Sequence, residues 1–168
     1  MNKQEISRQL PVELFKQSEG LCGPASLKIV LAYYGTEKTE DELANLMGAT
    51  KEYGCDPVDI VSAAEKLGFS AQYKEKSTIE EVTSFIDQDT PVIVQWFSPE
   101  ENGHYSVISG YEGSNLVMVD PLTGNIRRIA SQDFLNRWFE LDLYPPQNPA
   151  NFKLREIIVI KPKQQVTS

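Results

Sequence analysis

The chain has 168 residues, of which 40% are hydrophobic and 24% charged, and its formal net charge at pH 7 is -8. This length and mixture are typical of one globular domain, and the acidic balance argues against a protein that binds nucleic acid or anionic membranes. No segment has the apolar length of a membrane span or a secretory signal, so we expect a cytoplasmic protein without membrane insertion.

The beginning of the sequence predicts a lead-in followed by a first helix. Residues 1–16 are expected to be irregular or partly helical. Apolar residues then recur at helical spacing over residues 24–34, and Pro24 suits the first turn because its missing N–H would be unpaired there. Gly35 follows the last apolar residue of this run and is expected to end the helix.

Three more helices are predicted in the first half, because each of three apolar runs follows a capping pattern. Side-chain oxygens at these positions accept hydrogen bonds from backbone N–H groups that the helix leaves unpaired. The predicted starts are Thr39 with Glu42, Asp56 with Pro57, and Ser77 with Glu80. The first half is therefore predicted to be helical.

The second half changes to the period and composition of β-strands, with turn residues between the runs. The predicted strands cover residues 91–97, 104–112, 115–121, 126–130 and 154–162, and a helix capped by Ser131 covers residues 131–140. Helices followed by an antiparallel sheet indicate the α+β class. We expect a single domain over residues 1–168, with a structured core over about 12–162.

Cys22 stands at the start of the first predicted helix, in the stretch QSEGLCGPASLKIVLAYYG, residues 17–35. A thiolate at a helix N-terminus faces unpaired backbone N–H groups and the positive end of the dipole, which favours the nucleophilic form of cysteine. Gln17 could donate a side-chain N–H that forms an oxyanion hole together with the backbone N–H of Cys22. Taken alone, such a cysteine is more often a small buried hydrophobe.

A nucleophilic cysteine needs a base, and His104 is the one histidine of the chain. His104 follows the polar loop SPEENG and opens a predicted strand. The base in turn needs an orienting group, and Asp120 ends the following strand. Asp120 could equally be the start of a turn before Pro121.

The strand register opposes a contact between His104 and Asp120. The simplest hairpin turns at residues 113–114 and places Asp120 opposite Val107, so that the two side chains project from opposite faces of the sheet. A β-bulge near Gly110, or a strong local twist, is required to bring them together.

Four blocks in this order, QSEGLCGPASLKIVLAYYG, GCDPVDIVSAAEKLGF, GHYSVISGYEGSNLVMVDPLTG and FLNRW, resemble the double-glycine (bacteriocin leader) peptidases. These are papain-like cysteine peptidases of clan CA, best known as N-terminal domains of bacteriocin-exporting transporters. The resemblance implies a helical lobe with the cysteine helix, packed on an antiparallel sheet. It also implies that Cys22 is the nucleophile, His104 the general base, Asp120 the orienting residue and Gln17 the oxyanion donor.

We therefore expect a cysteine-dependent hydrolase, most directly a peptidase acting on a peptide or protein substrate. A catalytically silent peptide-binding module and an acyl-transferase that uses the same triad stay open, as does a weak homo-oligomer. Cys55 precedes Asp56, which disfavours a thiolate, and is interpreted as structural. Two cysteines and one histidine do not supply a zinc site, and no metal or cofactor is expected.

Overall fold

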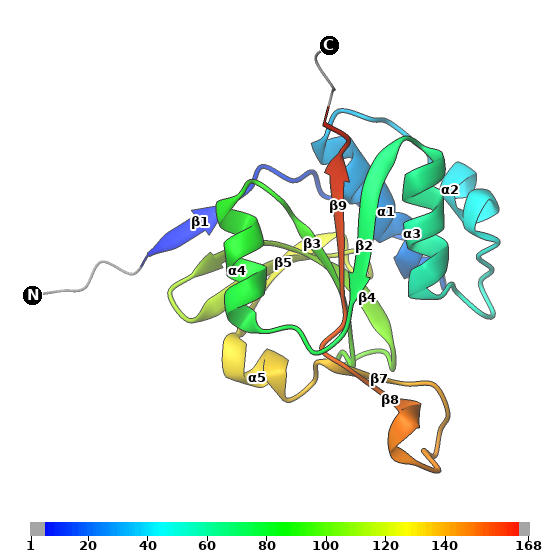
Figure 1. Cartoon of the computed structure of the whole chain (residues 1–168), viewed down its shortest axis with the longest axis vertical. Coiled ribbons are helices and arrows are strands. Elements are labelled where there is room, and N and C mark those ends of the chain that lie inside the picture. Colours follow the sequence, from blue (N-terminus) through cyan, green and yellow to red (C-terminus); the bar gives the residue numbers. More distant parts are fainter. Residues whose placement is uncertain (1–5, 165–168) are drawn as a thin grey trace, which may run out of the picture.

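In the computed structural model, which describes residues 6–164, the alternating apolar residues of the strands fall into two hydrophobic clusters on opposite faces of one sheet. Tyr105 and Val107 belong to one cluster, and Ile108 belongs to the other. Helices α1, α2 and α3 cover the first face, while α4 and α5 cover the second (Figure 1). Each face of the sheet is therefore buried, as the apolar runs of its central strands require.

The sheet is antiparallel throughout, with the strand order β2-β9-β3-β4-β5-β6 and with β1 beside the end of β4. A separate hairpin, β7-β8, lies below the sheet in Figure 1, where β7 contacts the central strand β3. The strands are β1 (Ser7–Gln9), β2 (Phe69–Lys74), β3 (Val92–Trp96), β4 (His104–Glu112), β5 (Asn115–Asp120), β6 (Asn125–Ala130), β7 (Phe139–Leu141), β8 (Phe152–Leu154) and β9 (Ile157–Pro162).

The helices are α1 (Cys22–Tyr33), α2 (Glu40–Met47), α3 (Pro57–Lys66), α4 (Ile79–Asp87), α5 (Ser131–Leu135) and the 3-10 helix η1 (Pro149–Asn151). The α+β class is confirmed, and so is the packing of the cysteine helix on the sheet. The capping box of Thr39 and Glu42 is present as expected, and Asp56 is the residue before α3. None of the described helices is both long and apolar enough to cross a bilayer.

Two strands of the main sheet were missed by the sequence patterns, and so was the separate hairpin, whose strand β7 lies at the end of the predicted helix 131–140. Residues 7–9 form β1, where an irregular or partly helical lead-in was expected, and residues 1–5 lie outside the described part. β3 pairs with β4 only as far as Ile108, so the edge of β4 beyond it is free for β1. β2 lies within the half predicted to be helical, where it covers the edge of β9. Both strands complete backbone hydrogen bonds that distant parts of the chain leave open.

Two predicted caps are displaced by one residue. The cap of α4 is Thr78, whose hydroxyl accepts from the Glu81 N–H, while Ser77 is buried before it. Ser131 is the first residue of α5 rather than its cap, and α5 ends at Leu135 because the chain then turns into β7.

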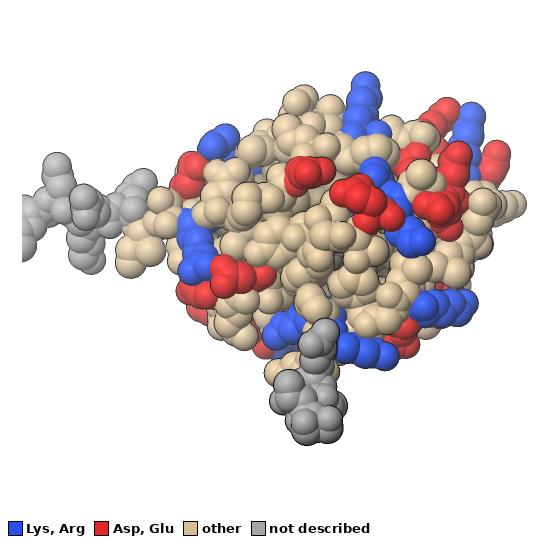
Figure 2. All heavy atoms as spheres, turned by 90° about the horizontal axis from the view of Figure 1, so that it is seen from above, with Lys and Arg blue, Asp and Glu red and all other residues tan. Residues whose placement is uncertain are grey.

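The surface carries charges of both signs. Figure 2 shows lysines and arginines next to acidic side chains around a broad uncharged area on one face. The ion pairs of this surface include Arg128 with Glu112 and Lys51 with Glu19. Such exposed pairs add little to stability, so the two buried clusters must provide most of it.

Candidate active site

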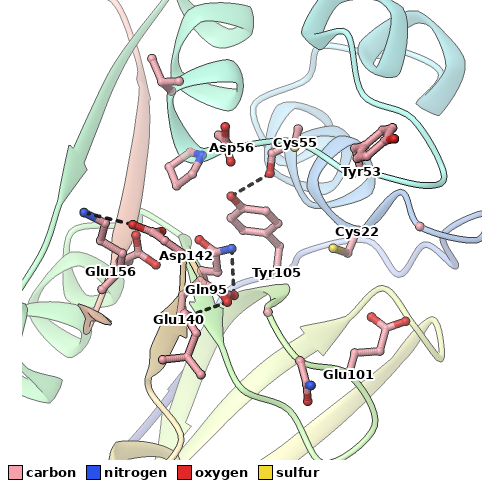
Figure 3. A pocket seen from close by; sticks show the side chains of 18 of the residues that line it. Cys22, Tyr53, Cys55, Asp56, Gln95, Glu101, Tyr105, Glu140, Asp142 and Glu156 are labelled. Atoms are coloured by element: carbon pink, nitrogen blue, oxygen red, sulfur yellow. Dashed lines mark hydrogen bonds and ion pairs between the residues drawn. The ribbon is translucent and has the colours of Figure 1, made fainter. Parts of the chain in front are cut away.

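The loop before α1 holds Cys22 at the helix N-terminus by bonds to distant segments. The Gln17 N–H donates to the Pro121 carbonyl at 2.8 Å, and the Ser18 N–H donates to the buried Glu40 carboxylate at 2.9 Å. Cys22 is the first residue of α1 and is partly exposed. Its side chain lines an open groove of about 970 Å³ (Figure 3). The loop backbone before Cys22 is therefore fixed, and the thiol is accessible to a ligand.

Gly20 makes this loop possible for two reasons. Its φ angle is +75°, a conformation that side-chain-bearing residues rarely adopt. A Cβ at this position would also lie 2.2 Å from the carbonyl oxygen of Lys51. The loop that carries Cys22 thus packs directly against the backbone of the segment after α2.

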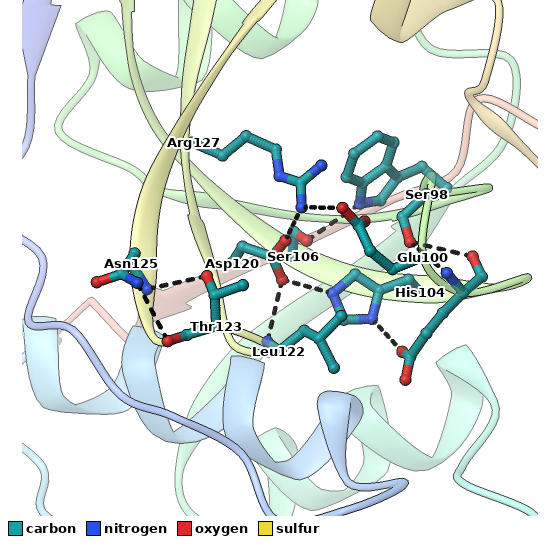
Figure 4. Close-up of polar contacts among 11 residues, drawn as sticks. Ser98, Glu100, His104, Ser106, Asp120, Leu122, Thr123, Asn125 and Arg127 are labelled. Atoms are coloured by element: carbon teal, nitrogen blue, oxygen red, sulfur yellow. Dashed lines mark hydrogen bonds and ion pairs between the residues drawn. The ribbon is translucent and has the colours of Figure 1, made fainter.

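His104 and Asp120 meet because β4 contains a bulge. Glu112 pairs with Asn115 as the simple hairpin predicts, but the register shifts between Ile108 and Gly110. A bulge near Gly110 was expected from the sequence and is confirmed. The shift places Asp120 on the same face as His104, and Nε2 of His104 lies 2.7 Å from Oδ1 of Asp120 (Figure 4).

The carboxylate of Asp120 is buried and is held by three partners. Besides the His104 contact, Oδ1 accepts the Leu122 N–H at 3.0 Å, and Oδ2 lies 2.9 Å from Nη2 of Arg127 (Figure 4). Burial by itself raises the pKa of Asp120, but the hydrogen bond and charge of His104, with Leu122 and Arg127, lower it below its usual value. Asp120 is therefore an anion at neutral pH.

His104 has no exposed surface, and its ring is held by the Asp120 carboxylate at Nε2 and lies near Cys22. Burial by itself lowers the pKa of His104, but the hydrogen bond to Asp120 and the nearby Cys22 and Asp120 charges outweigh it and raise the pKa to about 10. Because Nε2 is occupied by Asp120, Nδ1 is the nitrogen left for the thiol. This arrangement suits an imidazolium next to a thiolate.

Glu101 is a further group at the same nitrogen. Its Oε2 lies 2.9 Å from Nδ1 of His104, although the contact is not aligned as a hydrogen bond. Glu101 lies in the loop between β3 and β4 and lines the groove beside Cys22 (Figure 3). Its place in the polar loop SPEENG carries no sequence pattern that points to this contact.

Gln17 is buried next to this site, but its side-chain amide oxygen accepts no hydrogen bond within the described part of the chain. Its exposed fraction is 9%, and no described residue donates to Oε1. Its backbone is tied to the residue that follows Asp120. The structure thus brings Cys22, His104 and Asp120 together, and the oxyanion role of Gln17 stays a prediction.

Arg127 was missed, although the sequence contains a signal for it. Its side chain is 22% exposed, whereas that of the neighbouring Arg128 is 52% exposed. Asp120 pairs with Asn125 across the β5–β6 turn, so Arg127 is its diagonal neighbour on the same face. Its guanidinium also lies over the ring of Trp96, 5.6 Å from the centroid.

Cys55 lines the same groove as Cys22 but in a different electrostatic environment. Burial raises its pKa most, and the nearby Cys22, Asp59 and Asp56 raise it further. Cys55 is therefore a neutral thiol. Within residues 6–164 no three His, Cys, Asp or Glu side chains are grouped as a metal site.

Comparisons with known proteins find similar sequences. The sequence model of the family described as the peptidase C39 like family matches residues 9–143. The lactococcin-G-processing and transport ATP-binding protein LagD of Lactococcus lactis is 31% identical over 132 residues, which cover 79% of this chain and 18% of that protein. An uncharacterized protein of Methanothermobacter marburgensis, MTBMA_c00490, is 31% identical over 68% of this chain and 75% of its own length. The chain thus spans less than a fifth of the first of these relatives.

Solved structures share the fold. The peptidase domain of Streptococcus ComA, a bifunctional ABC transporter involved in quorum sensing, has a TM-score of 0.72 and 25% identity, over 90% of this chain and 99% of that one. A double glycine motif protease from an AMS/PCAT transporter, in complex with the leader peptide, has a TM-score of 0.70 and 21% identity, over 92% and 94%. The second likeness concerns the fold alone.

Proposed function

The chain belongs to the peptidase C39 like family, as its resemblance to the double-glycine peptidases indicated, and from this premise we propose that it is a cysteine peptidase. The observation that carries the proposal is the position of His104, which is held by Asp120 through Nε2 and lies near Cys22. This is the arrangement of nucleophile, base and orienting group that thiol-dependent amide hydrolysis requires.

In the proposed acylation step, the Cys22 thiolate attacks the carbonyl carbon of the scissile peptide bond. The carbonyl oxygen becomes an oxyanion, which the Cys22 N–H and the Gln17 side-chain amide stabilise. His104 then gives the proton on Nδ1 to the leaving nitrogen, the C–N bond breaks, and the amine product departs. The acyl group stays on the sulfur as a thioester.

In the proposed deacylation step, neutral His104 takes a proton from a water molecule, whose oxygen attacks the thioester carbon. The oxyanion is held by the same donors, and its collapse expels the Cys22 thiolate and releases the carboxylic acid. Asp120 keeps the ring in one orientation and stabilises the imidazolium in both steps. Arg127 and the Leu122 N–H keep the Asp120 carboxylate in place.

For the substrate we propose a peptide with glycine before the cleaved bond. Support comes from a protein of the same fold, a double glycine motif protease in complex with a leader peptide. The relatives in Lactococcus lactis are named as processing and transport proteins, and this chain spans only part of their length. The proposal for this chain is therefore limited to the peptide-cleaving step.

A mass-spectrometric screen of a peptide library tests the proposal, with glycine and other small residues on the acyl side of the cleaved bond. We expect cleavage after glycine by the natural chain and loss of cleavage in the matched Cys22→Ser variant. Cleavage that persists in Cys22→Ser would overturn the assignment of the nucleophile.

A peptide-binding module without cleavage is the second candidate, and the Glu101 contact favours it, because a carboxylate beside Nδ1 occupies the place that the reaction needs. Binding of library peptides without any cleavage, by both the natural chain and Glu101→Gln, would support this candidate.

A further inference from the structure

The groove extends past Tyr105 into an acidic end on the opposite side from Cys22 (Figure 3). Two lysines line the groove, and both are already paired. Lys51 binds Glu19 at 2.9 Å, and Lys153 lies 3.6 Å from Asp142 and 3.9 Å from Glu75. The carboxylates that line the whole groove are those of Glu52, Asp56, Glu75, Glu101, Glu140, Asp142 and Glu156.

Glu156 is the most deeply buried of these acids. Its exposed fraction is 3%, and it immediately precedes β9. Its Oε1 accepts a hydrogen bond from the Tyr73 hydroxyl at 2.5 Å, but its Oε2 has no partner among the described residues. No Lys, Arg or His nitrogen of the described residues lies within 4.0 Å of this carboxylate. A buried carboxylate oxygen without a donor is costly, and such a group points to a missing partner.

The surroundings of Glu156 determine the charge of that partner. Glu140 faces the same end, where Oε2 accepts from Gln95 at 3.2 Å and Oε1 accepts the Leu141 N–H at 2.7 Å. Burial raises the pKa of Glu156 to about 7, and the charges of Glu140, Glu75 and Asp142 add to the rise although the Tyr73 hydrogen bond opposes it. A neutral donor would leave this mutual repulsion in place, whereas a cation would relieve it.

We propose that this end of the groove, formed by Glu156 with Glu140 and Gln95, is a subsite for a lysine or arginine side chain of the peptide substrate. The inference rests on the proposed function, because the groove also contains Cys22. A guanidinium or ammonium has donors for the unpaired Oε2 of Glu156 and for the Glu140 carboxylate together. A peptide whose reactive carbonyl is at Cys22 would thus be selected by a positive side chain beyond Tyr105.

The test measures binding separately from cleavage. Fluorescent peptides with a central Gly-Gly carry arginine, or its neutral isostere citrulline, at each of four positions on either side, and anisotropy gives their affinity for the Cys22→Ser chain. At one position we expect arginine to bind about tenfold more tightly than citrulline, because only arginine forms charge-assisted hydrogen bonds to the carboxylates. In the double variant that carries both Cys22→Ser and Glu156→Gln, the preference for arginine over citrulline should fall to within about twofold.

The matched control is Glu52→Gln, which removes one charge from another part of the same groove and should keep the preference. A ratio near one at every position, a preference that Glu156→Gln leaves intact, or no binding of any peptide overturns the subsite. Cleavage by the natural chain separates the two proposals. A preference for arginine without cleavage supports the subsite and contradicts the peptidase function. Cleavage without a preference for arginine contradicts the subsite and supports the peptidase function.

Discussion

Val107 pairs with Val119 in the sheet, although an unbroken hairpin from the 113–114 turn would pair Val107 with Asp120. The difference of one residue is the bulge at Ser109, which lies between the paired residues Ile108 and Gly110. Because side chains alternate along a strand, this one residue moves Asp120 to the face that carries His104. The buried contact of 2.7 Å between them depends on it.

The bulge is itself stabilised by the N-terminal segment. The Leu10 N–H donates to the Ser109 carbonyl at 2.8 Å, which satisfies the group that the ladder leaves unpaired. At Gly110 a Cβ would lie 2.3 Å from the Arg8 carbonyl oxygen, so β1 can approach only a glycine there. The strand at one end of the chain thereby supports the geometry of the site.

The first prediction concerns thiol reactivity. At pH 6, iodoacetamide should modify Cys22 at least about tenfold faster than Cys55, because only Cys22 has an imidazolium partner and burial keeps Cys55 protonated. Mass spectrometry of proteolytic fragments measures both rates in one sample. In His104→Ala the rate at Cys22 should fall towards that of Cys55.

The pH dependence of this difference follows from the raised pKa of His104. The imidazolium is present below about pH 10 and loses its proton as pH rises through that value. The rate advantage of the natural chain over His104→Ala should therefore be large at pH 6–8 and should shrink towards pH 10. Equal rates at the two cysteines, or an advantage that grows with pH, contradict the ion pair.

The second prediction concerns Arg127 as a positioning residue. Arg127→Gln should lower kcat about tenfold and leave KM nearly unchanged. The reason is that the Asp120 carboxylate loses its interaction with the Arg127 guanidinium, which contributes about 1.5–3 kcal/mol, and then no longer orients His104. Steady-state kinetics with a cleaved peptide measures both parameters. The neighbouring Arg128→Gln, which breaks only an exposed pair with Glu112, is the control and should leave kcat unchanged. Equal effects of the two substitutions would show that Arg127 acts only through the surface charge.

The third prediction compares two glycines with similar backbone angles. Gly20 has a φ of +75° and Gly35 a φ of +83°, but only Gly20 lies against another backbone, at Lys51. Gly35→Ala should cost about 1–2 kcal/mol of unfolding free energy, the penalty of the left-handed conformation alone. Gly20→Ala should cost more and should also slow the labelling of Cys22, because the loop must move away from residue 51. Denaturant unfolding and iodoacetamide labelling test both, and similar results for the two variants would contradict the close packing of this loop.

The fourth prediction uses the raised pKa of Glu156. Its pKa in the folded state is about 7, above the ordinary value of 4.5, so the folded chain binds this proton more tightly than the unfolded chain does. The stabilisation is complete below about pH 4.5 and is lost as pH rises through 7. Glu156→Gln keeps a neutral side chain and should be more stable than the natural chain at pH 8, by about 3 kcal/mol, with the difference vanishing towards pH 4.5. Urea unfolding at a series of pH values measures it, and a difference independent of pH would rule out a buried titrating carboxyl.

Much of the fold is predictable from the sequence, because its signals are local. The capping box at Thr39, the proline after Asp56 and the turn at residues 113–114 each appear where short motifs place them. The cap of α4 was wrong because Ser77 and Thr78 both begin a capping-box pattern, and only packing chooses between them. β2 was missed because a six-residue edge strand after a helix carries too weak a pattern of its own.

The candidate site divides in the same way. The sequence singled out Cys22, His104, Asp120 and the need for a bulge, since a lone histidine and a cysteine at a helix start are visible as residues and the register can be counted. No sequence pattern pointed to the contact of Glu101 with His104. None pointed to the role of Glu156 either, because its partner Tyr73 lies 83 residues away in the chain.

By itself, therefore, the sequence determined which chemical groups the protein possesses and on which local elements they stand. Only the tertiary structure decided which of these groups are in contact and how far burial shifts their pKa values. It also decided that carboxylates line the far end of the groove beside Cys22. The physical reason is that hydrogen-bond contacts and desolvation depend on segments that are distant in the chain, whereas helix caps, turns and strand periodicity depend on neighbours within a few residues.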